Sequence, residues 1–330
     1  IPPSQIANDH LYGVFAFSAT DVWVVGQGGM LFSKSGASWV DAKPVGAGDL
    51  LSVWALASKS GLAVGDMHSV YGCSGCAAWS PLNPMTVGYL RGVWAANATN
   101  AWVVGDGGQI LKAGTTGTPA AETSNTTSQL NSVWGSSTTD VLAVGRSGAT
   151  VRRQGSTVWS KLNAGTNDHL SGLWGDGTRF WTTALHSSGD GQIYRLESGT
   201  WVAASGLLPS LTGLAGNAAP GAPDIWAVGV NGTLVQGNGT TWTVKSSGIV
   251  DNLLTVWGSS ETDIWAGGQK GTLLHFDGNT WTSVLPPTSD DITALHGTGK
   301  GNVWLTTGTG AILQYDGNAW HGTFMSGYAL

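Results

Sequence analysis

Residues 253–284 decide the fold of this chain; they read LLTVWGSSETDIWAGGQKGTLLHFDGNTWTSV. Four short runs of β-branched, leucine and aromatic residues stand in this stretch, separated by Gly, Ser, Asn and Asp, at 254–257, 263–266, 271–276 and 280–284. Runs of this length between turn-forming residues indicate β-strands joined by tight turns. The stretch therefore predicts a four-stranded antiparallel sheet.

The same phrase recurs eight times along the chain. Its first aromatic position falls at Phe15, Trp54, Trp94, Trp134, Trp174, Ala215, Trp257 and His296, in steps of 39, 40, 40, 40, 41, 42 and 39 residues. A second aromatic position holds Trp23, Leu62, Trp102, Leu142, Trp181, Trp226, Trp265 and Trp304. A third holds Trp39, Trp79, Trp159, Trp201, Trp242, Trp281 and Trp320, and the three positions together contain all 18 tryptophans.

These repeats predict an all-β protein, an eight-bladed β-propeller that forms a single domain over residues 1–330. One small sheet cannot bury both of its faces, but eight sheets packed around an axis can, and about 40 residues per four-stranded unit is typical of propellers. A seven-bladed propeller is the alternative. It is considered because the third repeat lacks the third-position Trp and the fifth has extra residues at 185–190.

Composition excludes several classes of protein. The chain has 14 Lys and Arg against 20 Asp and Glu, a net charge of -6, and no basic cluster, so it lacks the electrostatic signature of nucleic-acid binding. No apolar run approaches about 18 residues, so we expect no membrane span. The first residue is Ile, which we interpret as a processed N-terminus and as a sign of a secreted or cell-surface location.

The phrases VWGSS (256–260), DIWAGG (263–268) and FDGNTW (276–281) resemble the repeats of secreted bacterial propellers of the sialidase-like, Asp-box-type class. The resemblance covers all eight repeats. An Asp-box places one residue between its Asp and Gly, whereas Asp277 and Gly278 are adjacent here. The resemblance implies the propeller fold and export from a bacterial cell, and it implies no particular activity, because propellers support many functions.

Comparison of the repeats separates a structural face from a candidate binding face. The turn between the first two strands carries Asp or Asn in six repeats, as at Asp21, Asp140 and Asp263, where we expect the side chain to accept backbone N–H bonds. The opposite face differs from blade to blade, as expected of a ligand site on a fixed scaffold. The candidate ligand-binding residues, taken mainly from that face, are Asp66, His68, Arg91, Asp106, Arg146, His186, Gln269, Lys270 and Asp290.

Two of the irregular positions allow two interpretations each. Arg91 stands on an innermost strand, where it either points into the axial channel or forms an internal salt bridge. His296 replaces the first-position aromatic and is either a packed core residue or part of the channel lining.

Cys73 and Cys76 are the only cysteines, and we predict that they form a disulfide in the second repeat. A zinc site would need further ligands, for which His68 is the only neighbouring candidate, so no metal and no cofactor are expected.

Two functions follow from these features. The first is a non-catalytic, secreted, lectin-like propeller that recognises glycans or another extracellular macromolecule at its variable face, where shallow sites add by multivalency. The second is a secreted polysaccharide lyase or hydrolase with one site at the channel mouth, built from His68, His186, Arg91 and nearby carboxylates. A glycosidase would need two carboxylates at a defined separation.

Overall fold

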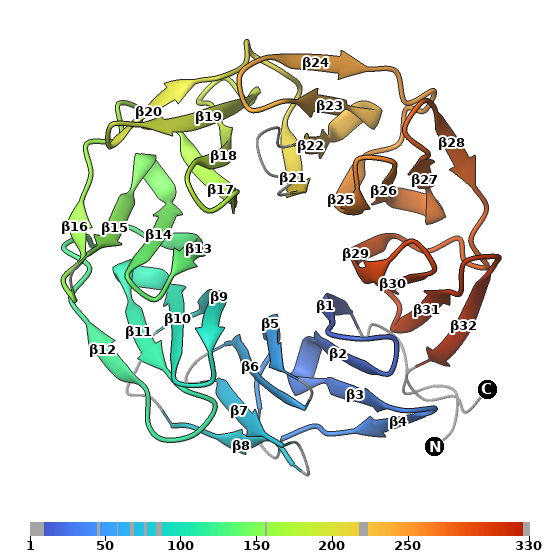
Figure 1. Ribbon diagram of the computed structural model, residues 1–330, viewed down its shortest axis with the longest axis horizontal. Coiled ribbons are helices and arrows are strands. Elements are labelled where there is room, and N and C mark those ends of the chain that lie inside the picture. The colour runs from blue at the N-terminus through green and yellow to red at the C-terminus, as the bar shows by residue number, and fades with distance from the viewer. Residues whose placement is uncertain are drawn as a thin grey trace.

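Figure 1 shows a computed structural model of the protein, which describes residues 10–44, 47–57, 59–66, 69–75, 78–83, 88–155, 157–217 and 224–325. In this part of the chain, 32 strands form eight antiparallel sheets of four strands each, and each sheet follows the order of the sequence. The sheets stand around a common axis, with β1, β5, β9, β13, β17, β21, β25 and β29 innermost. The eight-bladed propeller is confirmed, and the seven-bladed alternative is wrong.

Blades 1 to 4 have the following strands. Blade 1 contains β1 (Leu11–Ala16), β2 (Asp21–Gly26), the 3-10 turn η2 (Gln27–Gly29), β3 (Leu31–Ser35) and β4 (Ser38–Asp41). Blade 2 contains β5 (Leu50–Ala57), β6 (Ser60–Gly65), β7 (Val70–Ser74) and β8 (Ser80–Pro81). Blade 3 contains β9 (Leu90–Asn97), β10 (Asn100–Gly105), η3 (Asp106–Gly108), β11 (Ile110–Ala113) and β12 (Ala120–Glu122). Blade 4 contains β13 (Leu130–Ser137), β14 (Asp140–Gly145), η4 (Arg146–Gly148), β15 (Thr150–Gln154) and β16 (Ser160–Lys161).

Blades 5 to 8 follow the same plan. Blade 5 contains β17 (His169–Gly175), β18 (Phe180–Leu185), β19 (Gly191–Glu197) and β20 (Thr200–Ala203). Blade 6 contains β21 (Leu211–Asn217), β22 (Asp224–Gly229), η5 (Val230–Gly232), β23 (Leu234–Gly237) and β24 (Trp242–Lys245). Blade 7 contains β25 (Leu253–Ser260), β26 (Asp263–Gly268), η6 (Gln269–Gly271), β27 (Leu273–Phe276) and β28 (Trp281–Val284). Blade 8 contains β29 (Ile292–Gly299), β30 (Asn302–Thr307), β31 (Ala311–Tyr315) and β32 (Trp320–Met325).

The four described strands of blade 1 all come from the N-terminal part of the chain, and those of blade 8 all come from the C-terminal part. The ring therefore closes by packing of these two complete blades against each other. Strand β1 lies beside β29 (Figure 1). Val24 and Phe32 of blade 1 share a hydrophobic cluster with Trp304 and Ile312 of blade 8. Closure therefore depends on side-chain packing at this seam rather than on a strand exchanged between the two ends of the chain.

The tryptophans fill the spaces between blades, as the repeats predict. Twelve of the 18 are buried, and the second-position residues Trp102, Trp181, Trp226, Trp265 and Trp304 are at most 1% exposed. Burial of an aromatic side chain removes the largest apolar area that any residue offers. These rings are the main packing wedges of the propeller.

Glycine follows several first-position residues because the ring from the preceding blade lies against it. A Cβ added to Gly216 would meet the Trp174 ring at 2.7 Å, and one added to Gly135 would meet the Trp94 ring at 2.5 Å. Real Cβ atoms essentially never make contacts this short. The first-position Trp of one blade therefore packs its ring against the glycine that follows the first position in the next blade. We call this contact the Trp-Gly pair, and it joins adjacent blades.

The repeated Asp turns are structural, but their hydrogen bonds differ from the expected ones. Asp263 is fully buried, and its carboxylate accepts hydrogen bonds from Ser259 Oγ, Trp265 Nε1 at 3.1 Å and His275 Nε2 at 2.8 Å. Asn302 accepts in the same way from the indole and carboxamide groups of blade 8. The expectation of backbone N–H donors was wrong for these residues, because the side chain points into its blade toward polar groups on the neighbouring strands.

Cys73 lies on β7, is about 1% exposed and is disulfide-bonded. Its predicted partner, Cys76, lies outside the described residues, and so does His68. No helix in the described ranges is long and apolar enough to span a membrane.

Candidate functional site

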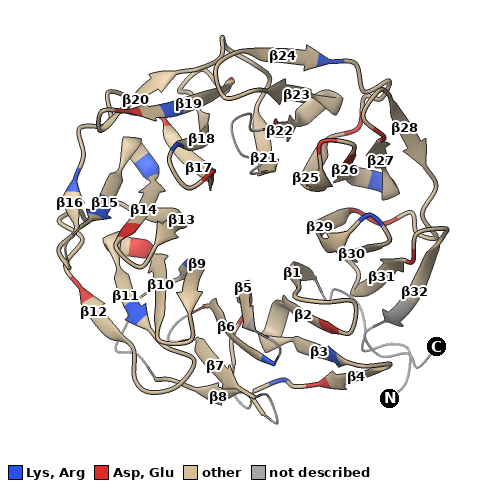
Figure 2. Cartoon of the chain, in the orientation of Figure 1, with Lys and Arg blue, Asp and Glu red and all other residues tan. Residues whose placement is uncertain are grey.

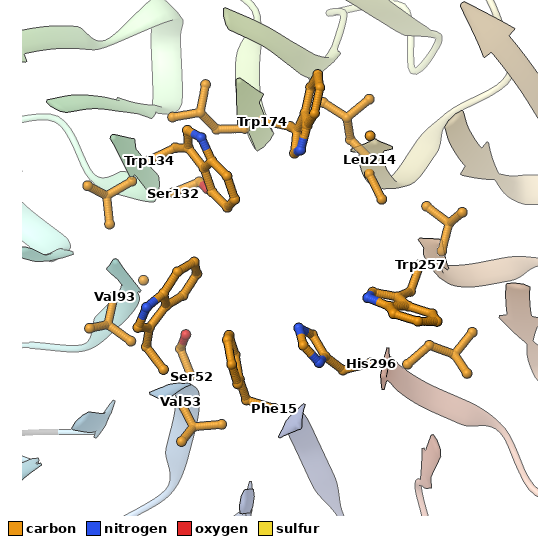
Figure 3. A pocket seen from close by; sticks show the side chains of 18 of the residues that line it. Phe15, Ser52, Val53, Val93, Ser132, Trp134, Trp174, Leu214, Trp257 and His296 are labelled. Atoms are coloured by element: carbon orange, nitrogen blue, oxygen red, sulfur yellow. The ribbon is translucent and has the colours of Figure 1, made fainter. Parts of the chain in front are cut away.

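A cavity of about 560 Å³ lies on the axis of the ring, and every blade contributes to its wall. Figure 3 shows the side chains that surround it, which come from the innermost strands. Most blades supply a Val or Leu, such as Val53, Val256 and Leu295, followed by the first-position residue of the repeat. The register that packs the blades thus also places the first aromatic position at the axis.

Five ring side chains form a continuous arc along the cavity wall. The Phe15 ring centroid lies 4.2 Å from that of His296, in a stacked arrangement, and 5.1 Å from that of Trp54. The arc continues from His296 to Trp257 at 5.9 Å and from Trp54 to Trp134 at 5.7 Å. All five side chains are only partly buried. We call Trp257, His296, Phe15, Trp54 and Trp134 the aromatic arc.

The wall of the cavity at blade 6 is different. Ala215 and Gly216 stand where other blades have an aromatic residue and a small one, and Leu214 precedes them. The neighbouring Trp174 is buried because its ring lies against Gly216 and stacks on Trp181, with centroids 5.6 Å apart. The absence of a large side chain at Ala215 leaves space beside the aromatic arc.

His296 is a neutral member of the aromatic arc. Its Nδ1 accepts a hydrogen bond from the backbone N–H of Ala16 at 3.1 Å, so the proton of the neutral ring is on Nε2. Burial among apolar rings lowers the pKa of His296 from 6.5 to about 4. At neutral pH the imidazole is therefore an uncharged donor.

The indole N–H groups of the arc have no hydrogen-bond partner among the described residues. Those of Trp54, Trp134 and Trp257 belong to side chains that line the cavity, and none is sealed in the interior. Five second-position indoles instead donate to the scaffold, as in the bond from Trp226 Nε1 to Asp224 Oδ2 at 2.8 Å. In Figure 3 the nitrogen edges of Trp257 and Trp174 turn toward the interior of the cavity.

Arg91 is the one residue among Lys, Arg, Asp and Glu in the described lining of this cavity. Its Nε donates to Asp106 Oδ1 at 2.7 Å, and the two side chains are 32% and 29% exposed. Asp106 begins η3, so the pair lies where the connections between blades gather, on the face that varies between repeats. Both interpretations of Arg91 are correct, because it lines the channel and also forms an ion pair.

The environment of Asp106 favours its ionised form. Partial burial by itself raises the pKa of its carboxyl. Hydrogen bonds from Arg91 and from the backbone N–H of Tyr89, together with the charges of Arg91 and Arg146, outweigh burial and lower the pKa below its usual value. Three predicted residues, Arg91, Asp106 and Arg146, are thus electrostatically coupled at this end of the channel.

Among the predicted residues that the structure describes, Arg91 alone lines the cavity; those other than Arg91, Asp106 and Arg146 lie in separate turns. Lys270 Nζ pairs with Asp251 Oδ1 at 2.6 Å, which raises the pKa of Lys270, and its backbone N–H donates to Asp291 in the next blade at 2.9 Å. The adjacent Gln269 holds its turn through backbone bonds. Figure 2 shows charged residues spread over the blades, with few on the innermost strands.

Three more candidates form hydrogen bonds within their own turn or to a neighbouring connection. The Nδ1 of His186 lies 2.9 Å from Ser188 Oγ, and that hydroxyl donates to Asp190 at 2.6 Å. Asp290 accepts a hydrogen bond from the hydroxyl of Thr309. The backbone N–H of Asp66 donates to the Asp49 carbonyl at 2.7 Å.

The described residues named for the enzymatic alternative are not gathered at one place. Of its described candidates, Arg91 is the one that lines the cavity, and His186 stands in a separate turn of blade 5. No group of three His, Cys, Asp or Glu side chains gathers to hold a metal ion within the described part of the chain.

Sequence reasoning missed the aromatic arc because it treated the first-position aromatic rings as packing and considered a place in the channel lining for His296 alone. The signal that was available was the break in the repeat at Ala215 and His296, two replacements of the common Trp. Both positions line the cavity.

Comparison with known proteins adds evidence on the fold. No family model matches the chain, and no curated protein matches it in sequence. The chain is similar to the computationally designed Ika8 protein, at a TM-score of 0.78 and 12% identity over 94% of this chain and 98% of that one. It is also similar to the C-terminal WD40 domain of Sif2, at 0.67 and 11% over 96% of both chains. A structure of YCF48 bound to a D1 peptide matches at 0.60 and 12% over 93% of this chain and 91% of that one.

These identities show a shared fold and nothing finer. The eight-bladed propeller stands on both the structure and the comparisons. The Asp-box class expected from the repeats is not among these three similar structures.

Proposed function

We propose that this protein is a non-catalytic binding propeller that holds a segment of a protein partner in its axial cavity, entered from the face that carries Arg91 and Asp106. The observation that supports this most directly is the aromatic arc, which leaves five rings partly exposed around about 560 Å³ of space. Ligand sites are mostly apolar cavities of about 300–1,000 Å³ with a few polar groups that fix orientation. One of the similar propellers, YCF48, binds a peptide.

Energetic considerations favour a binding role for these rings. Exposed large aromatic surfaces are unfavourable in water, and aromatic anchors in pockets contribute most of the affinity in many interfaces. Among the first-position tryptophans, Trp94 and Trp174 are buried, whereas Trp54, Trp134 and Trp257 stay partly exposed at the cavity. The other partly exposed tryptophans of the described residues lie on outermost strands, far from the axis: Trp39, Trp242 and Trp281.

A random peptide library displayed on phage and selected on the immobilised full chain tests this proposal. The decisive variant is Ala215→Trp, which restores the Trp found at this position in five other blades and fills the cavity without removing any packing. A Cβ added to Gly258, the equivalent glycine of blade 7, would meet Ile264 Cδ1 at 2.3 Å, so the place that a first-position ring takes on the next blade is filled here and the new ring extends into the cavity. We expect selected peptides to bind the wild type and to lose most of their affinity for Ala215→Trp.

Trp281→Phe is the matched control, because it changes a tryptophan of blade 7 that does not line the cavity. It should bind the selected peptides as the wild type does. Peptides that bind Ala215→Trp and the wild type equally would place recognition elsewhere and contradict the proposal.

A glycan, the ligand expected from the sequence, is the alternative to a peptide in this cavity. Saturable binding of cellohexaose that Ala215→Trp abolishes would favour a glycan over a peptide.

We also propose, from the sequence resemblance, that the protein is exported by a bacterium. Fractionation of cells that express the full-length gene tests this, and a cytoplasmic protein would contradict it.

A further inference from the structure

The side chains that line the axial cavity offer more hydrogen-bond donors than acceptors. We infer from this that the cavity binds a proline-rich segment in the extended polyproline II conformation. This inference rests on the proposed function and specifies its ligand. It goes further than that function because it requires a ligand backbone with carbonyl groups and few N–H groups, which a general peptide site would not require.

Donors outnumber acceptors among the side chains that line the cavity. The donors include the indole N–H groups of Trp257 and Trp174, whose nitrogen edges turn toward the interior in Figure 3, and the Nε2–H of His296. Arg91 adds its terminal guanidinium N–H groups, since only its Nε has a hydrogen-bond partner among the described residues. No carboxylate stands in the described lining.

The one carboxamide of the lining is already engaged. Asn131 donates from Nδ2 to the Leu170 carbonyl at 2.7 Å, and its Oδ1 accepts from Gln129 Nε2 at 2.6 Å. The hydroxyls of Ser52 and Ser132 are the remaining side-chain acceptors of the described lining. The side chains of the lining therefore favour a ligand that brings acceptors and few donors.

Proline supplies this combination within a peptide. Each proline residue has a backbone carbonyl and no N–H group, so a run of prolines is rich in acceptors and lacks backbone donors. Polyproline II segments bind to aromatic-lined grooves elsewhere, where the preformed helix reduces the entropy lost on binding. The flat rings of Phe15, Trp54 and Trp257 give the pyrrolidine rings an apolar surface of this kind.

Two other ligand classes fit the cavity less well. An organic cation would prefer ring faces and a nearby carboxylate, but Trp257 and Trp174 turn their nitrogen edges inward and Arg91 adds positive charge. A glycan carries one hydroxyl donor for nearly every acceptor, and the lining offers few acceptors for those donors.

Two short peptides test the inference directly on the wild-type chain. They are acetylated and amidated hexaproline and hexaalanine, which match in length and differ in backbone N–H groups and ring surface. We expect hexaproline to change the tryptophan fluorescence saturably and to release or absorb heat in calorimetry. Hexaalanine should bind at least about tenfold more weakly, because its N–H groups would lose solvent without gaining acceptors. Equal affinity for the two peptides would overturn the inference.

A variant separates hydrogen bonding from ring contact. Trp257→Phe keeps an aromatic face and removes one donor, and we expect it to weaken hexaproline binding by about fivefold. Trp281→Phe removes an indole N–H that has no partner and lies outside the cavity, so it should leave the affinity unchanged. Unchanged binding by Trp257→Phe, with circular dichroism as for the wild type, would contradict the assignment of the donors.

The two proposals can fail separately. Library peptides without proline that lose affinity for Ala215→Trp would support the proposed function and overturn the proline inference. Saturation of the wild type by cellohexaose or by acetyl-trimethyllysine amide, with no response to hexaproline, would also overturn it.

Discussion

The Nδ1 atom of His296, in blade 8, accepts a hydrogen bond from the backbone N–H of Ala16, in blade 1, at 3.1 Å. This bond joins the last blade to the first across the seam that no exchanged strand secures. It also fixes the tautomer that directs the Nε2–H away from Ala16. One residue therefore contributes both to ring closure and to the lining of the cavity.

Acid should weaken the protein through this residue. The pKa of His296 is about 4 in the folded protein against 6.5 for the ordinary side chain, so the unfolded chain binds more protons between these values. Its contribution to stability is complete above pH 6.5, decreases as the pH falls toward 4 and does not change further below 4. The loss amounts to at most about 3 kcal/mol, and urea unfolding at a series of pH values measures it.

The variant His296→Phe isolates this contribution from that of other titrating groups. It lacks the titrating nitrogen, so its stability should depend less on pH than that of the wild type between pH 6.5 and 4. Parallel curves for the two proteins in that range would show that His296 titrates normally in the folded state.

Asp263→Ala should destabilise the propeller strongly, because it leaves the donors of Ser259, Trp265 and His275 without their acceptor in a buried place. We expect a loss of about 3 kcal/mol or more, measured by urea unfolding. Asp277→Ala, in an exposed turn of the same blade, is the control and should cost much less. Equal losses for the two variants would mean that the buried network contributes nothing beyond an ordinary turn.

Gly216→Ala tests the contact between adjacent blades. The new Cβ would meet the Trp174 ring at 2.7 Å, so the ring must move or the blades must separate. Overpacking of this kind costs about 1–3 kcal/mol. Gly299→Ala, whose Cβ would meet nothing within 4 Å, is the matched control on an innermost strand. A difference smaller than the error of thermal unfolding would contradict the role assigned to the Trp-Gly pair.

Two ion pairs of the variable face should differ in their effect on binding. Arg91→Gln removes the charged donor that lines the cavity, whereas Lys270→Gln removes a side chain that is 77% exposed and outside it. Arg91→Gln should change stability by no more than about 1 kcal/mol, as is usual for pairs near the surface, and Lys270→Gln should change it little because that side chain is exposed. Calorimetry with a cavity-binding peptide should show weaker binding for Arg91→Gln only. A larger loss for Lys270→Gln would move the site from the channel to the rim.

The sequence by itself determined the blade count, the strand order and the burial of most tryptophans. Eight repeats of nearly equal length allow no other simple arrangement, since each sheet can cover its faces only by packing on copies of itself. The sequence also distinguished the structural turns, which carry Asp263 and its equivalents, from the variable turns. A residue that recurs at the same turn in most blades has the same structural role in each. Local patterns of this kind depend on neighbours that are close in the sequence.

Only the tertiary structure decided which residues surround the axis and what they contact. Phe15 and His296 are 281 positions apart in the sequence, yet ring closure stacks them at 4.2 Å. The pairing of Arg91 with Asp106 and the separation of His186 from the cavity likewise depend on where each turn lies around the ring. A repeat specifies the position of a side chain within its own blade, whereas a binding site is formed by side chains from many blades that converge, and convergence is a property of the closed ring.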